Sequence, residues 1–142
     1  MKPGPILLIE DDVDDQEFII DALQTLGIQN EVLTFDSGKK ALDFLRIATQ
    51  QPFMIISDVN LPVMNGLQLK YEIQKDEYLR SKSIPFIFLS TSADPKAVKE
   101  AFDLSVQGFF VKPDSMSELK ETIDLIMKYW KRCVSPNCKS SA

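Results

Sequence analysis

The chain contains no histidine among its 142 residues. This absence excludes a Ser-His-Asp or Cys-His active site and any metal site built on imidazole, because histidine is the usual proton carrier and nitrogen ligand in such sites. It also excludes a role as a histidine phosphodonor. Any chemistry of this chain must therefore come from other side chains.

Cysteine is scarce as well, since only Cys133 and Cys138 are present. A protein without structural disulfides is typical of the cytoplasm, and two cysteines without further ligands do not make a zinc site. Long apolar runs are also missing, so we expect no membrane span. Residues 1–5 lack the apolar stretch and cleavage site of a signal peptide. Together these absences predict a cytoplasmic protein.

Basic residues are outnumbered, with 16 Lys and Arg against 21 Asp and Glu and a net charge of −5. No basic stripe is visible, which disfavours nucleic-acid binding. The length and the hydrophobic content of 44% are ordinary for one domain with a full core. We therefore expect one domain at 1–132 and a flexible tail at 133–142, with no attached DNA-binding or enzymatic output domain.

Apolar strand-like runs alternate with segments of helical period, which favours βα units and a parallel sheet. The predicted strands are Ile6–Glu10, Glu31–Phe35, Phe53–Asp58, Phe86–Ser90 and Gly108–Val111. The first, third and fourth are apolar nearly throughout, as in strands covered on both faces, and the second is mixed, as at a sheet edge. The predicted fold is α/β, a doubly wound five-stranded parallel sheet with helices on both faces.

Each helical segment has a recognisable start. The candidate capping or first residues are Asp14 or Asp15, Asp36 or Ser37, Gly66, Asp94 before Pro95, and Ser115. Gly27 is expected to end the first helix. The residues expected to face inward are Phe18, Ala22, Leu23, Leu26, Ala41, Leu42, Leu45, Leu69, Ile73, Leu119, Ile123, Ile126, Met127 and Trp130.

Four of the predicted strands end in polar groups of complementary charge. These groups are Glu10-Asp11-Asp12, Asp58, Ser90-Thr91 and Lys112. They are expected to share one edge of the sheet, because ligands of a doubly wound sheet bind outside the carboxyl ends of its strands. A cluster of carboxylates, a hydroxyl and an ammonium binds a hard divalent cation and handles a phosphoryl group.

The carboxylates of this edge suit Mg²⁺, which takes oxygen ligands and keeps several waters. Asp11 and Asp58 are candidate direct ligands, and Glu10, one methylene longer, can ligate through water. Without a cation, converging carboxylates would repel one another and raise a pKa. The alternative is that Glu10, Asp11 and Asp12 serve loop polarity or helix capping, and that Asp58 is a cap or turn residue.

A carboxylate such as Asp58 can also be a phosphoryl nucleophile that forms an acyl phosphate. Lys112 would then offset charge on the transferring oxygens, although a lysine at this position is also compatible with a surface role. Ser90 can donate a hydrogen bond to a phosphoryl group or merely satisfy backbone groups, and Thr91 should point the other way. Phe109 is either a core residue or a mobile aromatic.

Four separated motifs carry a resemblance to a known family. They are Leu7-Leu8-Ile9-Glu10-Asp11-Asp12, Ser57-Asp58-Val59-Asn60-Leu61-Pro62-Val63-Met64-Asn65-Gly66, Phe88-Leu89-Ser90-Thr91-Ser92, and Gly108-Phe109-Phe110-Val111-Lys112-Pro113. In this order and spacing they resemble the receiver domain of two-component response regulators, of the stand-alone, chemotaxis-regulator-like kind. The resemblance covers about 5–130.

The resemblance implies a flavodoxin-like fold with strand order 2-1-3-4-5, and a phosphoacceptor at Asp58. It implies Mg²⁺ held by Asp11, Asp58 and the Asn60 carbonyl, with Glu10 bound through water. It further implies Ser90 as the switch hydroxyl, Lys112 as the phosphate-contacting lysine and Phe109 as the aromatic that changes rotamer. A cis peptide between Lys112 and Pro113 is also implied.

The implied phosphodonor is a histidine kinase or a histidine phosphotransfer protein, and the implied output is an unknown downstream protein, a second copy of this chain, or a further relay of the phosphoryl group. The polar segment Gln74–Ile84 resembles stand-alone receivers partnered with phytochrome-type and other sensor kinases. Four positions depart from the commonest pattern: Glu10 for Asp, Ser90 for Thr, Phe109 for Tyr, and Asp114 for an aromatic residue.

One rival hypothesis comes from the enzyme class. Small phosphohydrolases of the haloacid-dehalogenase type also use an Asp nucleophile and Mg²⁺, with a second Asp two residues later as acid and base. Here that position is Asn60, and no cap insertion is present. Turnover on a phosphomonoester distinguishes this rival from a signalling switch, which would catalyse only its own phosphorylation and dephosphorylation.

Overall fold

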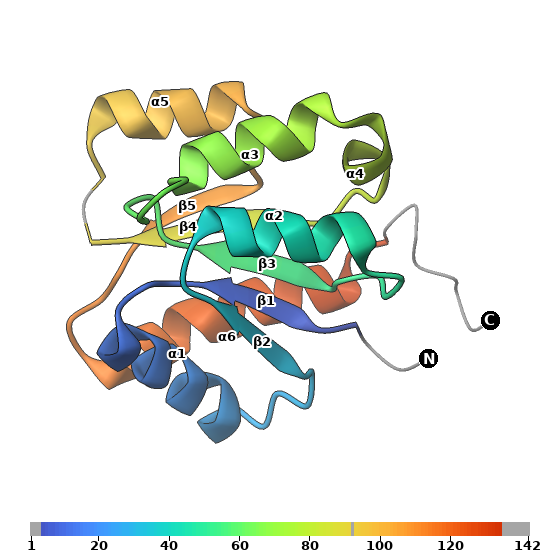
Figure 1. The fold of residues 1–142 in the computed structure, drawn as a ribbon. Helices are drawn as coiled ribbons and strands as arrows, with labels where there is room; N and C mark the ends of the chain where they lie inside the picture. The colour runs from blue at the N-terminus through green and yellow to red at the C-terminus, as the bar shows by residue number, and fades with distance from the viewer. Residues whose placement is uncertain (1–3, 92, 135–142) are drawn as a thin grey trace.

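The computed structural model describes residues 4–91 and 93–134, and these residues form a five-stranded parallel sheet in the order β2-β1-β3-β4-β5 (Figure 1). The strands are β1 (Ile6–Ile9), β2 (Val32–Phe35), β3 (Met54–Ser57), β4 (Phe86–Ser90) and β5 (Gly108–Val111). The doubly wound sheet and its strand order are confirmed. β1 and β3 end one residue earlier than predicted, so Glu10 and Asp58 lie just outside the ladder.

Helices cover both faces of the sheet (Figure 1). They are α1 (Val13–Thr25), α2 (Gly38–Ile47), α3 (Gly66–Lys75), α4 (Glu77–Ser81), α5 (Pro95–Asp103) and α6 (Met116–Arg132). α1 and α6 lie against one face, and α2, α3 and α5 lie against the other. Right-handed crossovers between parallel strands produce this two-sided cover.

Alternation along the strands divides the core into two layers. In β1, Leu7 and Ile9 face the α2–α3 side, whereas Ile6 and Leu8 face the α1–α6 side. β1, β3 and β4 are buried throughout, and β2 lies at an edge, as their compositions predict. The three central strands are therefore held rigidly by packing on both faces, and they fix the positions of the residues at their carboxyl ends.

Three predicted helix caps are confirmed, because Ser37, Asp94 and Ser115 each accept a hydrogen bond from a backbone N–H of the first turn. The predicted cap of α1 was wrong. Asp12 Oδ1 accepts from the Asp15 N–H at 3.1 Å, so Asp12 is the cap and Asp15 lies inside the first turn. The helix begins sooner than expected because the chain leaves β1 already at Ile9.

The short helix α4 was not predicted. It lies in the polar segment Gln74–Ile84, where the Asp76 side chain accepts from the Leu79 N–H and Leu79 is the buried residue. Five residues with one apolar anchor are too few for a helical period to show in the sequence. Packing of Leu79 into the core stabilises this helix.

Among the described residues, no helix combines the length and apolarity that crossing a bilayer requires. Cys133 is exposed. Ser92, Cys138 and most of the predicted tail, at 135–142, lie outside the described residues.

Candidate functional site

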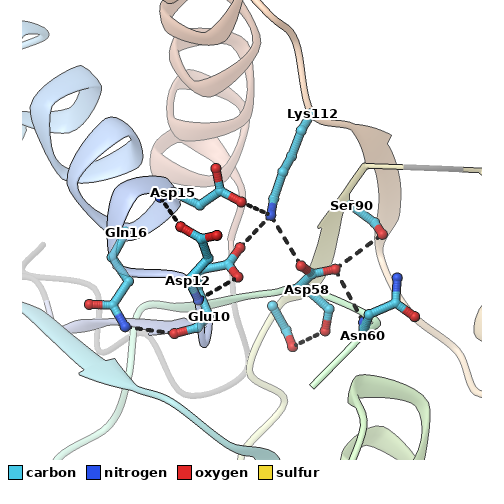
Figure 2. A network of polar contacts seen from close by, with 9 residues as sticks. Glu10, Asp12, Asp15, Gln16, Asp58, Asn60, Ser90 and Lys112 are labelled. Atoms are coloured by element: carbon cyan, nitrogen blue, oxygen red, sulfur yellow. Dashed lines mark hydrogen bonds and ion pairs between the residues drawn. The ribbon is translucent and has the colours of Figure 1, made fainter. Parts of the chain in front are cut away.

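The carboxyl ends of β1, β3, β4 and β5 bring the predicted polar residues together at one edge of the sheet (Figure 2). Glu10, Asp58 and Ser90 are buried there, and Asp11 is exposed beside them. Hydrogen-bonded pairing of the central strands fixes the spacing of these side chains.

Asp58 occupies the centre of this cluster. Its backbone N–H donates to the Ile9 carbonyl at 3.0 Å, which ties it to the end of β1. Its Oδ1 accepts from the Asn60 N–H at 3.2 Å. Gly66 lies so close that a Cβ there would stand 2.3 Å from the Asp58 carbonyl oxygen and 2.5 Å from the Phe88 ring. Only glycine permits this approach of α3 to the loop that follows β3.

Ser90 is the hydroxyl that meets Asp58. Its Oγ donates to Asp58 Oδ1 at 3.1 Å, in a buried contact at the end of β4. Thr91 is exposed, in agreement with the expectation that it points elsewhere. The backbone N–H of Lys112 donates to the Ser90 carbonyl at 2.6 Å, which carries the pairing of β4 and β5 one residue further.

Lys112 extends from the end of β5 across the site, and its ammonium contacts three carboxylates (Figure 2). The Nζ atom lies 3.1 Å from Asp58 Oδ2 and 2.9 Å from Asp15 Oδ2, and it donates a short hydrogen bond to Glu10 Oε1. The Lys112 side chain is only 10% exposed. It is the cation that offsets the negative charge of this cluster.

The electrostatics of the cluster appear in two pKa shifts. Burial raises the pKa of Glu10 to about 7, with Lys112 opposing the shift and the Asp58 charge adding to it. Burial acts to lower the pKa of Lys112, but its hydrogen bonds to Glu10 and Asp15 and the charge of Asp58 outweigh burial and hold it above the usual range. Lys112 is therefore a permanent cation, and Glu10 takes up a proton near neutral pH.

Asp15 is a site residue that the sequence reasoning missed. The sequence suggested only a helix cap, yet its carboxylate makes an ion pair with Lys112, 97 positions away in the chain. The early start of α1 turns Asp15 toward the sheet edge. The signal that could have found it is the run Asp14-Asp15 one turn after the acidic triplet.

The donor set fits a hard divalent cation. One carboxylate oxygen from each of Glu10, Asp11 and Asp58 lies within 4.8 Å of the others. Three acidic groups at this spacing repel one another, and oxygen-only ligands are those that Mg²⁺, Ca²⁺ and Mn²⁺ prefer. Asn60 follows Asp58 in the same loop, with an exposed side chain.

The predicted cis peptide between Lys112 and Pro113 was wrong. No peptide bond in the described part of the chain is cis, so this bond is trans. Trans is the lower-energy isomer for X-Pro bonds in general. The hydrogen bond from Lys112 to the Ser90 carbonyl already aligns the end of β5, so that the lysine reaches the site along a trans chain.

Phe109 packs inward from β5. Its ring centroid lies 5.6 Å from that of Phe88, and it is half-buried against the α2–α3 side of the core. Phe110 points outward and is 36% exposed. Phe109 thus packs against the core, one of the two roles considered for it, whereas the rotamer change expected of Phe109 remains a prediction.

Residues 6–124 match the model of the response regulator receiver domain. The chain belongs to this family. The receiver is 33% identical over 132 residues to the probable methanogenesis regulatory protein FilR2 of Methanothrix harundinacea, covering 90% of this chain and 84% of that protein. It is 28% identical to response regulator Rcp1 of a Synechocystis species, covering 94% and 92% of the two chains.

Solved structures agree with this assignment. The phosphorylated cyanobacterial phytochrome response regulator RcpA superposes with a TM-score of 0.84 at 29% identity, over 94% of this receiver and 98% of that chain. The Mn²⁺-bound form of Rcp1 superposes with a TM-score of 0.80 at 28% identity and the same coverage. Receiver domains are signalling switches of two-component systems, and the acidic cluster of this receiver is consistent with a divalent cation.

Proposed function

We propose that this receiver is a cytoplasmic, stand-alone response regulator that accepts a phosphoryl group on Asp58 from a histidine kinase or a histidine phosphotransfer protein. One observation carries the proposal. The Asp58 carboxylate lies between the Ser90 hydroxyl and the Lys112 ammonium, beside two further carboxylates. An attack by an Asp58 oxygen would therefore take place beside groups that offset the charge of the transferring phosphoryl group.

Asp11, Asp58 and the Asn60 carbonyl would hold Mg²⁺, with Glu10 bound through water. When bound, the ion neutralises negative charge on the phosphoryl oxygens. In the present structure Lys112 balances the acidic cluster, and it would transfer its hydrogen bonds to the phosphoryl oxygens after reaction. The carboxylates of Glu10 and Asp15 compete with the phosphoryl group for this ammonium.

Phosphorylation would bias an existing equilibrium between two states. The Ser90 hydroxyl, now donating to Asp58, would move to a phosphoryl oxygen, and Phe109 would change rotamer behind it. The surface of α5, β5 and α6 carries the exposed side chains of Phe102, Phe110 and Val111. We assign the output to this surface, through contact with a downstream protein or with a second copy of the receiver, and not to DNA, because the net charge of −5 grows further on phosphorylation.

The test is chemical labelling with acetyl phosphate and Mg²⁺, followed by intact-mass measurement. The wild-type protein should gain one phosphoryl group, and Asp58→Asn should gain none. Asp14→Asn is the matched control, because Asp14 is an exposed residue in the first turn of α1 and lies outside the ion-pair cluster. Normal labelling of Asp58→Asn would refute the assignment. Turnover of a generic phosphomonoester would instead favour the phosphohydrolase.

A further inference from the structure

A cavity lies at the opposite ends of the strands from Asp58. It has a volume of about 290 Å³ and is bordered by α3, by α4, by the residues that precede β4 and β5, and by Trp130 of α6. Asp58 and Lys112 follow strands and Ser90 ends one, whereas Pro85 and Gln107 of this cavity precede strands. The cavity is therefore separate from the acidic cluster.

Lys70 is the unusual residue of this cavity. It is only 6% exposed, although it is a lysine on α3. Within the described part of the chain its ammonium has no hydrogen-bond or ion-pair partner, and its one recorded contact is with the Phe86 ring, whose centroid is 5.6 Å away. Burial lowers the pKa of Lys70, and no neighbouring anion opposes that shift. The burial belongs mainly to the aliphatic stem, because the Lys70 Nζ is not among the fully buried polar atoms that lack a partner in the described part of the chain. The ammonium therefore opens onto the cavity, where an anion can reach it.

Four other lysines of the helices show a contrast with Lys70. Lys39, Lys75, Lys99 and Lys128 each make an ion pair with an acidic residue three or four positions away, and each is more than half exposed. These are ordinary surface pairs of little energetic consequence. Lys70 alone among these five is directed into a cavity without such a partner.

The charge of the cavity wall is positive. Lys70 and Arg80 line it, and none of its lining residues is acidic. One Nη atom of Arg80 donates to the Gln74 carbonyl at 3.1 Å, which holds the guanidinium at the rim and leaves other N–H groups for a ligand. The chain as a whole has a net charge of −5, but the lining of this cavity carries two positive charges and no negative one. The cavity therefore attracts anions.

The remainder of the wall combines apolar residues with the polar residues Gln74, Ser83, Ser105 and Gln107. Ile84, Pro85 and Trp130 contribute carbon surface, and Gln107 has its amide engaged in hydrogen bonds to the Phe86 N–H and the Ser105 carbonyl. Inorganic anions gain nothing from such a surface, whereas an organic anion buries its hydrocarbon part there. The volume lies at the small end of the range for ligand pockets, which limits the ligand to a small molecule.

We propose that this cavity binds a small organic carboxylate, whose charged group meets Lys70 and Arg80 and whose apolar body lies against Ile84, Pro85 and Trp130. The carboxylate supplies the counter-anion that Lys70 lacks among residues 4–91 and 93–134. The proposal is independent of the function proposed for Asp58, because the two sites share no residue.

The test uses benzoate as the probe and follows the lysine Cε resonances and the single Trp130 indole N–H by NMR. Benzoate should shift the Lys70 and Trp130 signals saturably, and the neutral isostere benzamide and inorganic phosphate should not. Lys70→Leu, which keeps the apolar volume, should weaken benzoate binding by about tenfold or more. Lys75→Leu, on the same helix and exposed, should leave the affinity unchanged.

Two results would overturn the proposal: no saturable shift of either signal, or equal benzoate affinity in the wild-type protein and Lys70→Leu. An equal response to phosphate would also overturn it, since the apolar wall would then be irrelevant. If Lys70→Leu does not fold, Arg80→Gln gives the same comparison from an exposed position, with an expected loss in affinity of several-fold.

Discussion

Lys112 is the cation on which the acidic cluster depends, and removing its charge gives the sharpest test of the site. In Lys112→Met the side chain keeps most of its length and loses the ammonium that contacts Glu10, Asp15 and Asp58. Without metal, no other cation is in contact with these carboxylates among the residues that the structure describes. The variant should therefore be less stable in the absence of divalent ions.

The magnitude follows from the distances. Unit charges about 3 Å apart attract by about 5 kcal/mol at an effective dielectric constant of about 20, before desolvation is counted. Removing one partner of a buried pair typically costs about 3–5 kcal/mol. Glu10 relieves part of the cost by taking up a proton, since its pKa is already about 7. We expect a loss of about 3 kcal/mol in the free energy of unfolding at neutral pH.

The measurement is urea unfolding in EDTA and again in saturating Mg²⁺. If Asp11, Asp58 and Glu10 hold the ion, Mg²⁺ should restore at least half of the loss in Lys112→Met and stabilise the wild-type protein less. Lys99→Met is the control, because the Lys99 pair with Asp103 is exposed and should contribute less than about 1 kcal/mol. A wild-type urea midpoint for Lys112→Met in EDTA, or equal stabilisation of both proteins by Mg²⁺, would refute the reasoning.

Three further predictions concern the carboxylates. Asp11→Asn should weaken Mg²⁺ binding by about tenfold in calorimetry, because the ion loses a charged oxygen; unchanged affinity would exclude direct ligation. Asp15→Asn should lower stability in EDTA by about 1 kcal/mol, since its side chain is 38% exposed and screened, whereas Asp14→Asn should not change it. Between the unfolded pKa of 4.5 and the folded pKa of about 7, folded Glu10 keeps a proton that the unfolded chain releases. Metal-free stability should thus fall by at most about 3 kcal/mol from pH 5 to pH 8, and Glu10→Gln should remove this dependence in the same urea series.

The fold was largely predictable because its local signals agree with one another. Runs such as Phe86–Ser90 are apolar nearly throughout, as in strands covered on both faces, and the structure has the strand within the same bounds. Ser37, Asp94 and Ser115 cap their helices as their positions indicate. Such signals depend on residues within one turn of each other, so the sequence displays them directly.

The predictions from sequence were wrong where the local conformation of the chain depended on packing against residues far away in the sequence. Asp12, Asp14 and Asp15 are equally good caps by type, and the end of β1 decided among them. The short helix α4 exists because Leu79 reaches the core. The Lys112–Pro113 bond can take either isomer in an isolated chain, and the pairing of β5 with β4 accompanies the trans form.

By itself, the sequence determined the alternation of strands and helices, the two-layered core and the set of polar groups at the strand ends, because periodicity and residue type are local properties. Only the tertiary structure decided which of those groups touch. It placed Asp15 on Lys112 across 97 positions, and it buried the stem of Lys70 with no acidic partner within the part of the chain that the structure describes. Contacts of this kind depend on strand register and helix docking to within about an ångström, and no pattern along the chain records distances on that scale.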